Sequence, residues 1–229
     1  MLRKSLLIVL SASLMFLSCR KHSDDPEPET PSVSVVPEVD YEAVDLGLSV
    51  LWCNKNLGAK NAYSAGDYYA WGEVDTKDLY SPKTYSYCDS DLYSLTKYSE
   101  ADGFTRLLLF DDAAYVQLGE NWRMPTVEEC NELINNCLWT WQSAADATTP
   151  NGYTITSKTN GNSIFLPIVG RYEESGFYGW QETGSYWTSD LDTEQISMAK
   201  YIRFTESKKG KISSFARSSG LPIRPVSDK

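Results

Sequence analysis

The chain has 229 residues, and its 21 Lys and Arg against 31 Asp and Glu give a formal net charge of −10 at pH 7. Such an acidic surface repels phosphate backbones, which excludes nucleic-acid binding as the main function. The only histidine is His22, close to the N-terminus. The globular part therefore lacks Ser-His-Asp and Cys-His catalytic sets and the common zinc sites that use histidine.

Residues 1–18 have the pattern of a secretion signal. Arg3 and Lys4 form a basic start, and residues 5–16 form an uncharged apolar run. This run is shorter than the roughly 20 apolar residues that a membrane-spanning helix needs. It ends in Phe-Leu-Ser-Cys, which is similar to the lipoprotein box of bacteria, although that box usually has Leu in place of Phe. We expect lipidation of Cys19; the alternative is an ordinary signal peptide with an incidental cysteine.

Residues 19–40 are rich in Pro, Ser and acidic side chains and contain little that could build a core. This composition predicts an extended tether. Residues 23–25, Ser-Asp-Asp, resemble the acidic export signal of Bacteroidota surface lipoproteins. We therefore expect a protein that is lipid-anchored to the outer membrane and faces the cell exterior. The alternative is a solvated acidic linker. Residues 41–229 suit a single domain.

Two helices are predicted in this domain, at residues 111–118 and 126–137. The first has two aspartates at its positive end and Gly119 as its stop. The second begins with a capping box, in which Thr126 and Glu129 bond each other's backbone amides.

Strand patterns occupy most of the rest, with turn signals between them. Residues 160–162 and 209–211 are predicted to close hairpins around Gly161 and Gly210. The fold class is therefore α+β, with long irregular loops. The predicted strands are residues 43–53, 68–71, 153–156, 163–167, 186–189, 199–204 and 221–226.

Four cysteines follow Cys19, an even number that suits disulfides in an exported protein. Cys130 and Cys137 lie on one predicted helix, roughly 10 Å apart along its axis, so they cannot pair with each other. Cys53 or Cys88 must then supply the partners. The alternative is that these are free thiols, because Cys130 and Cys137 also lie on the apolar stripe of the helix.

Ten short blocks, in the same order as here, carry a resemblance to a known family. They are residues 44–49 (VDLGLS), 52–54 (WCN), 57–59 (LGA), 66–73 (GDYYAWGE), 111–114 (DDAA), 122–126 (WRMPT), 137–141 (CLWTW), 162–167 (NSIFLP), 184–189 (GSYWTS) and 223–226 (IRPV). Nearly everything after Tyr41 resembles the Fibrobacter succinogenes major paralogous domain family. The resemblance implies a C-type lectin-like fold, with two helices and a looped, mostly antiparallel sheet. Proteins of this fold include lectins, adhesin tips and formylglycine-generating enzymes, so it favours binding without fixing a ligand.

Most residues of these blocks are interpreted as scaffold. Trp52, Trp71, Trp122 and Trp187 are expected in the core, and Arg123 and Arg224 are expected to bond buried carbonyls or acids.

Acidic residues are the remaining candidates for chemistry. Asp190 and Asp192 follow Tyr-Trp-Thr-Ser where calcium-binding lectins have Trp-Asn-Asp, and the sequence has no Glu-Pro-Asn or Gln-Pro-Asp tripeptide. We therefore expect no metal site. Glycosidases need two acids that face each other across a cleft, and the mere presence of Glu73, Asp75, Glu128 and Glu129 does not indicate such a pair. We expect a protein that is not an enzyme and binds no cofactor.

Two segments, residues 80–98 and 171–181, are richer in aromatic side chains than polar loops require. Exposed aromatic rings indicate a recognition surface; the alternative is that these rings pack the loops onto the domain. The expected function is a binding or adhesion module for a glycan or a surface protein, and the runner-up is a structural subunit of a cell-surface assembly. The candidate ligand residues are Tyr85, Tyr87, Tyr172, Phe177, Tyr178 and Trp180.

Overall fold

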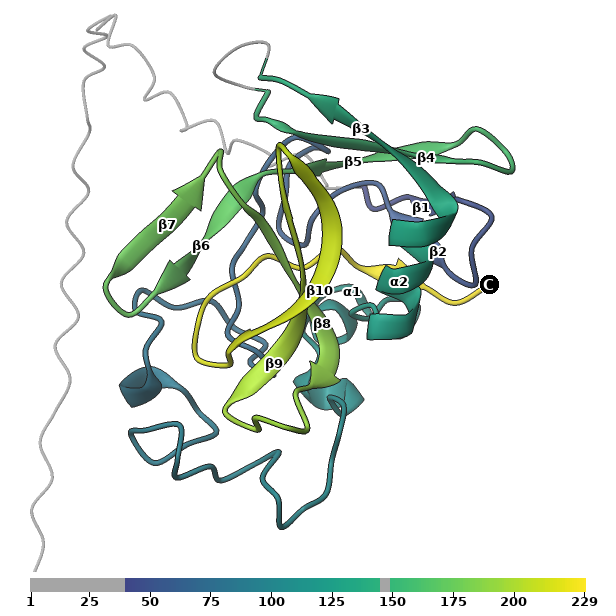
Figure 1. Ribbon diagram of the computed structural model, residues 1–229. Coiled ribbons are helices and arrows are strands. Elements are labelled where there is room, and N and C mark those ends of the chain that lie inside the picture. Colours follow the sequence, from purple (N-terminus) through teal and green to yellow (C-terminus); the bar gives the residue numbers. More distant parts are fainter. Residues whose placement is uncertain (1–39, 145–148) are drawn as a thin grey trace, which may run out of the picture. The chain divides into compact units, whose positions relative to one another are not determined.

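The computed structural model describes residues 40–144 and 149–229 (Figure 1). The predicted signal peptide, Cys19 and the tether up to residue 39 lie outside these residues. The described part has two α-helices and eleven strands, which form four separate antiparallel sheets. The predicted α+β class is confirmed, with sheet as the larger component.

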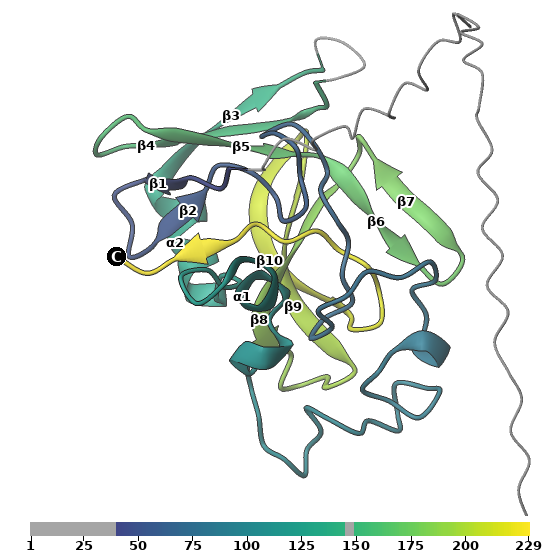
Figure 2. The ribbon, with the colours of Figure 1, turned by 180° about the vertical axis from the view of Figure 1, so that it is seen from behind.

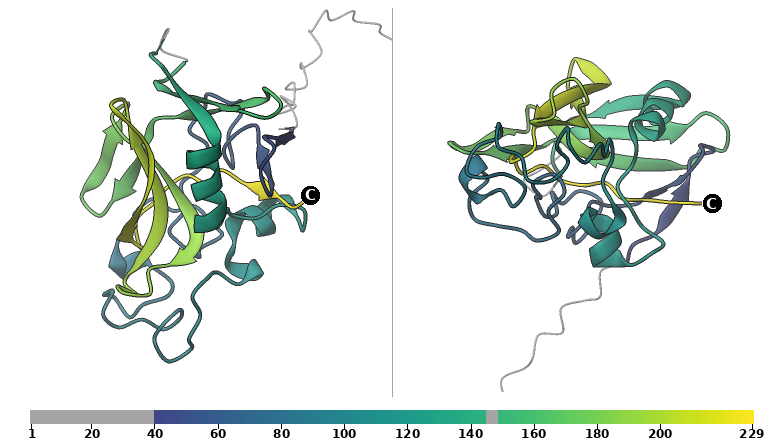
Figure 3. Two further views of the ribbon diagram at one scale, coloured as in Figure 1. Left: turned by 45° about the vertical axis from the view of Figure 1, so that its right-hand side comes forward. Right: turned by 90° about the horizontal axis from the view of Figure 1, so that it is seen from below.

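A three-stranded sheet runs through the middle of the domain. It consists of β8 (Gly184–Leu191), β9 (Met198–Thr205) and β10 (Lys208–Ala216), with β9 in the centre. Helix α2 (Val127–Asn136) packs against all three strands (Figure 3). Its buried residues Cys130, Leu133 and Ile134 lie on the stripe that the sequence predicts.

A second sheet continues directly from α2 and consists of β3 (Cys137–Gln142), β4 (Gly152–Ser157) and β5 (Ser163–Pro167). One face of this sheet packs on the central one, where Trp139 and Tyr153 contact Phe204 at ring-centroid distances of 5.6 and 5.8 Å. The core lies between the two sheets and α2.

Two smaller sheets complete the domain. Strand β2 (Leu51–Cys53) pairs with β1 (Ala43–Asp45) on one side and with β11 (Val226–Ser227) on the other (Figure 2). Strands β6 (Val169–Glu173) and β7 (Gly176–Trp180) form a separate hairpin.

Both predicted helices form where the sequence places them. In α2, the Thr126 hydroxyl accepts the Glu129 amide at 3.2 Å, and the Glu129 carboxylate accepts the Thr126 amide at 2.8 Å. Helix α1 (Ala113–Leu118) begins at Asp112, whose carboxylate accepts the amides of its first turn, and ends at Gly119, with φ of 91°. Three of the predicted core tryptophans, Trp52, Trp71 and Trp187, are buried, whereas Trp122 is only half-buried.

Several predicted strands differ from the structure. Residues 43–53 are two strands, because the chain turns between β1 and β2 at Gly47, with φ of 69°. Residues 68–71 make a single bridge, between Tyr69 and Leu221, and only the end of 221–226 is a strand. The hairpin at Gly161 is confirmed, but β9 and β10 turn at residues 206–207 instead of 209–211. Gly210 lies within β10, where a Cβ atom would come within 2.9 Å of Trp139 and Ile202.

All four cysteines among the described residues are free thiols, so the pairings considered for Cys53 and Cys88 are not present. Cys53, Cys130 and Cys137 are buried and Cys88 is partly buried, and burial raises the pKa of all four thiols. The structure thus corresponds to the alternative, in which they act as small apolar residues.

Arg224 joins three separate segments from a position that is only 1% exposed. Its Nη1 donates to the Cys53 carbonyl at 3.0 Å, its Nη2 to the Phe165 carbonyl at 2.8 Å, and its Nε to Asn56 Oδ1 at 2.8 Å. Asn56 in turn donates from Nδ2 to the Ala65 carbonyl at 2.9 Å. The prediction that Arg224 bonds buried carbonyls is confirmed, and the guanidinium holds β2, β5 and the loop before residue 66 together.

Replacing Arg224 by Met should lower the free energy of unfolding by about 3 kcal/mol or more. Three buried oxygens would lose their donors, and each unsatisfied buried polar group costs about 1–3 kcal/mol. Urea denaturation measures the change. Arg203→Met, at a partly exposed position on β9, is the matched control and should change the free energy much less. Equal small effects of the two substitutions would contradict the role given to Arg224.

Candidate functional site

The tyrosines of residues 80–98 hold that segment onto the domain. Tyr85 is 3% exposed; its hydroxyl donates to the Trp71 carbonyl at 2.7 Å and accepts Arg217 Nε at 3.0 Å. Tyr98 is fully buried and its hydroxyl donates to Asp111. The prediction that Tyr85 is a ligand residue is therefore wrong, because both its ring and its hydroxyl are used inside the protein.

Tyr87 belongs to the same internal cluster. It is half-buried, its ring lies against Tyr85 and Tyr98, and its hydroxyl contacts Asp111 Oδ1 at 2.7 Å. The fully buried Arg217, which the sequence analysis did not single out, donates to the carbonyls of Lys97, Tyr98 and Ile196 and fixes the far end of the segment. Packing of the loop, the alternative interpretation, is thus what the structure shows for Tyr85 and Tyr87.

The second set of predicted residues lies at the surface. Residues 171–181, expected as a loop, form most of the hairpin of β6 and β7. On β7, Phe177 is 39%, Tyr178 41% and Trp180 49% exposed, and the half-buried Tyr172 pairs with Phe177 from β6. These four residues are called the hairpin aromatic surface below.

A backbone kink places Trp180 beside Phe177. Positions three residues apart point to opposite faces of a regular strand, yet the two rings lie 6.1 Å apart. Gly179 between them has φ of 71°, and Gly170, which lies opposite it in β6, has φ of 65°. A Cβ atom at Gly170 would come within 2.4 Å of the Tyr178 carbonyl. The two glycines therefore permit Tyr172, Phe177 and Trp180 to form one row of rings. Tyr178, the neighbour of Phe177 in β7, lies outside this row, and its hydroxyl donates to Ser175 Oγ at 2.7 Å.

Two further tyrosines support this row from below. Tyr68 meets Tyr172 and Phe177 edge-on, at 4.9 and 5.8 Å, and Tyr80 stacks on Tyr172 at 5.5 Å. The Tyr80 hydroxyl donates to the Tyr68 carbonyl, and the Tyr68 hydroxyl donates to the Val169 carbonyl. Burial raises the pKa of Tyr80 to about 12. The rings are fixed before any ligand arrives.

A groove of about 380 Å³ runs beside the supporting tyrosines. Tyr68, Tyr80 and Tyr172 line it together with the carboxylates of Asp67 and Asp78, which are exposed. Lys77, at the same groove, is engaged with Glu73 and with the Thr84 carbonyl. Aromatic rings beside carboxylate acceptors suit a ligand with an apolar face and hydroxyl groups.

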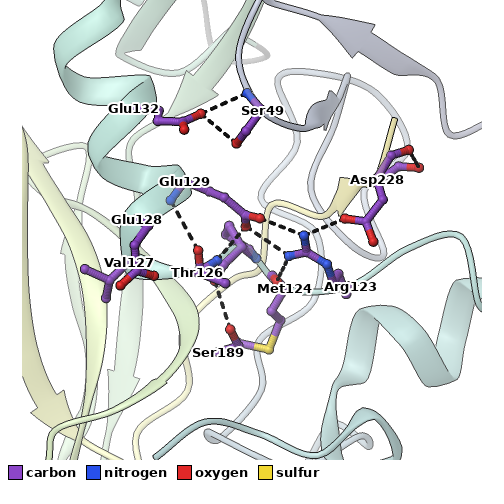
Figure 4. Close-up of polar contacts among 12 residues, drawn as sticks. Ser49, Arg123, Met124, Thr126, Val127, Glu128, Glu129, Glu132, Ser189 and Asp228 are labelled. Atoms are coloured by element: carbon purple, nitrogen blue, oxygen red, sulfur yellow. Dashed lines mark hydrogen bonds and ion pairs between the residues drawn. The ribbon is translucent and has the colours of Figure 1, made fainter.

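Acidic residues line a different groove, of about 450 Å³, beside the start of α2 (Figure 4). Glu129 completes the capping box and accepts both terminal nitrogens of Arg123, at 2.9 and 2.6 Å. Glu132 accepts the amide and hydroxyl of Ser49, at 2.9 and 2.7 Å. These carboxylates bind parts of the scaffold to one another and are not free to face each other across a cleft.

Asp190, Asp192 and Glu73 are similarly engaged, whereas Asp75 is exposed and Glu128 only pairs with Arg106 at the surface, at 3.1 Å. Asp190 accepts the Val127 amide at 2.7 Å and pairs with Arg106, and Asp192 pairs with Lys200 at 2.9 Å. Glu73 accepts the Ser86 amide at 2.7 Å. Within residues 40–144 and 149–229, no group of three or more His, Cys, Asp or Glu side chains is arranged to hold a metal ion.

Comparison with known proteins identifies no relative. No protein-family model matches the chain, and no curated protein or solved structure matches it either. In the part of the chain that the structure describes, no helix is long and apolar enough to cross a membrane.

Asp112, at the acidic groove, predicts a pH dependence of stability. Burial raises the pKa of Asp112 to about 6, although three backbone amides, from Met124, Tyr115 and Ala114, favour its charged form. Because this pKa lies above its ordinary value, protonation favours the folded state, and the resulting stability is lost as the pH rises through 6.

Lowering the pH from 7 to 5 should therefore contribute about 1 kcal/mol of stability through Asp112. Asp112→Asn keeps a side-chain acceptor for the helix cap but cannot titrate, so it should lack this gain. Urea denaturation of both proteins at the two pH values measures the difference. An equal response of the two proteins would contradict the raised pKa.

Proposed function

We propose that this chain is a surface lipoprotein of the outer membrane, anchored through Cys19. Residues 41–229 form a non-enzymatic binding or adhesion module of C-type lectin-like fold, and its ligand is a glycan or a surface protein. The family resemblance of the ten sequence blocks supports this fold, as do the two helices and the antiparallel sheets joined by long loops.

The hairpin aromatic surface is the observation on which this proposal rests. Among the tyrosines of residues 80–98 the domain buries Tyr80, Tyr85 and Tyr98 and leaves Tyr93 97% exposed, whereas the rings of Phe177, Tyr178 and Trp180 are all about 40–50% exposed on one hairpin. Rigid, half-exposed aromatic side chains provide a large contact area at a small entropic cost, and they dominate the energy of many interfaces. Their position next to a groove with free hydroxyl acceptors favours a glycan.

A structural subunit of a surface assembly is the second candidate. Leu108, Leu109 and Phe110 are 40%, 49% and 81% exposed, and Val116 on α1 is 44% exposed. Contiguous exposed apolar side chains of this kind are typical of protein contacts. In addition, β3 is an edge strand of its sheet and contains no charged residue to discourage pairing with another strand.

Replacing both Tyr178 and Trp180 by Ala should abolish ligand binding, because it removes the two most exposed rings of the hairpin. The measurement is binding of the purified full-length protein to a glycan array, with a pulldown of surface proteins in parallel. Tyr93→Ala is the matched control, since Tyr93 is 97% exposed and lies outside the hairpin.

Saturable binding that the double substitution removes and Tyr93→Ala preserves is the expected result. A silent array, together with one stoichiometric protein partner that Phe110→Ala releases, would instead establish the structural subunit. Binding that survives the double substitution would exclude the hairpin aromatic surface as the ligand site.

A further inference from the structure

A third groove, of about 460 Å³, lies on the outer face of the sheet formed by β3, β4 and β5. Thr154 and Phe165 are cross-strand partners in its floor, on the opposite face of the sheet from Tyr153 and Ile155, which belong to the core. Tyr63, from the loop between β2 and η1 (Pro82–Thr84), lines the groove as well.

The described residues that line this groove include no acid and no base. Charged residues make up 23% of the chain. Charged side chains line both the groove of about 380 Å³ beside Tyr68 and Tyr80 and the acidic groove at the start of α2. A charged ligand would lose its hydration here without gaining a countercharge, which is costly. The groove therefore favours a neutral ligand.

The lining side chains offer one aromatic platform surrounded by hydroxyl and amide groups. Tyr63 is 45% exposed and its ring lies 5.0 Å from that of Phe165. Around it are Asn54, Gln142, Thr154 and Ser163. The electron-rich face of an aromatic ring attracts the C–H face of a pyranose, while hydroxyl and amide groups can both donate to and accept from sugar hydroxyls.

Existing contacts leave donors available in this set. Asn54 Oδ1 accepts the Glu42 amide at 3.2 Å, so its Nδ2 is the atom left to meet a ligand. Ser143 Oγ, also in the groove, accepts Trp141 Nε1 at 3.2 Å and keeps its own proton to donate. Polar groups that are fixed around an aromatic ring in this way determine the orientation of a ligand.

The wall and the floor are held by the Arg224 contacts already described. Arg224 donates a hydrogen bond directly to the Phe165 carbonyl in the floor. It also donates to Asn56, which in turn donates to the Ala65 carbonyl. Asn61 Oδ1 accepts the amides of Tyr63 and Ser64, at 2.9 and 3.1 Å, which fixes the loop that presents the Tyr63 ring. A site fixed in advance loses little entropy when a ligand binds.

We propose that this neutral groove is a second binding site, separate from the hairpin aromatic surface, and that it takes a neutral saccharide. Its ring platform, its hydroxyl and amide groups and the absence of charge among its described lining residues carry the inference. The proposal does not depend on ligand binding by the hairpin, so an experiment can refute either site without refuting the other.

Titration calorimetry of the full-length protein tests this proposal. The probes are neutral hexasaccharides of glucose and of mannose in several linkages, with an oligogalacturonate of equal length as the acidic comparison. At least one neutral probe should bind saturably, and the acidic one should bind at least tenfold more weakly. Tyr63→Ala should weaken the neutral interaction about tenfold or more, and Ser163→Glu, which places a charge in the groove, should do the same.

Two controls separate the ring from the fold and from the hairpin. Tyr63→Phe keeps the platform and should retain binding within about threefold. Trp180→Ala removes a ring of the hairpin and should leave intact the part of the neutral interaction that Tyr63→Ala weakens. Thermal melting checks that each variant is folded.

Absence of saturable binding by every neutral probe would overturn the proposal. So would neutral binding that Trp180→Ala removes and folded Tyr63→Ala preserves, which would assign the saccharide to the hairpin. Tighter binding of the oligogalacturonate would also overturn it.

Discussion

The buried guanidinium of Arg224 is the interaction on which most of this domain depends. Its nitrogens bond the Cys53 carbonyl of β2, the Phe165 carbonyl of β5 and the Asn56 side chain. Carbonyl and amide dipoles surround the charge, and burial lowers the pKa of Arg224 from its ordinary value. Arg217 has the same role in residues 80–98, where it bonds three carbonyls. In a protein with long irregular segments, two buried arginines supply contacts that regular strand pairing supplies elsewhere.

Local signals in the sequence account for the parts of the fold that were predicted correctly. The capping box of α2, the Asp112 cap of α1 and the apolar runs of β5, β8 and β9 are all readable within a few residues. Strands β3, β6, β7 and β10 were missed although each pairs with a neighbouring strand in the chain, because their own sequences lack a clear strand pattern; β6 and β7, for example, contain Gly170, Gly176 and Gly179. β10 has a polar sequence, and β3 follows α2 with no breaker residue between them. The turn at Gly47 was missed because Leu46 and Leu48 maintain an apolar pattern through it.

The candidate site could be predicted only in part. Two segments were equally aromatic, and composition alone could not tell that most rings of residues 80–98 pack inward, Tyr93 excepted, while the rings of β7 stay half-exposed. The decisive contact for Tyr85 comes from Arg217, 132 residues away in the chain, so no local pattern reports it. The neutral groove left no local signal either, because its residues come from three separate segments: the loop after β2 with Asn54 and Tyr63, β4 with Thr154, and β5 with Phe165. The nearest signal in the sequence is Tyr63 two residues after Asn61, because asparagine favours a turn and a turn places the ring that follows it near the surface.

The pairing of β11 with β2 has a consequence for the order in which the domain can be completed. A ribosome makes β2, Asn56 and Phe165 well before it makes Arg224 and β11, which follow every other described strand. Until then, the polar groups that Arg224 satisfies have only water as a partner, and β2 lacks one of its two neighbours. The sheets and α2 can collapse on their local contacts, but the loop that presents Tyr63 to the neutral groove must wait for Arg224. Final ordering of the binding surface is therefore a late, long-range step that takes place after synthesis of the other described elements.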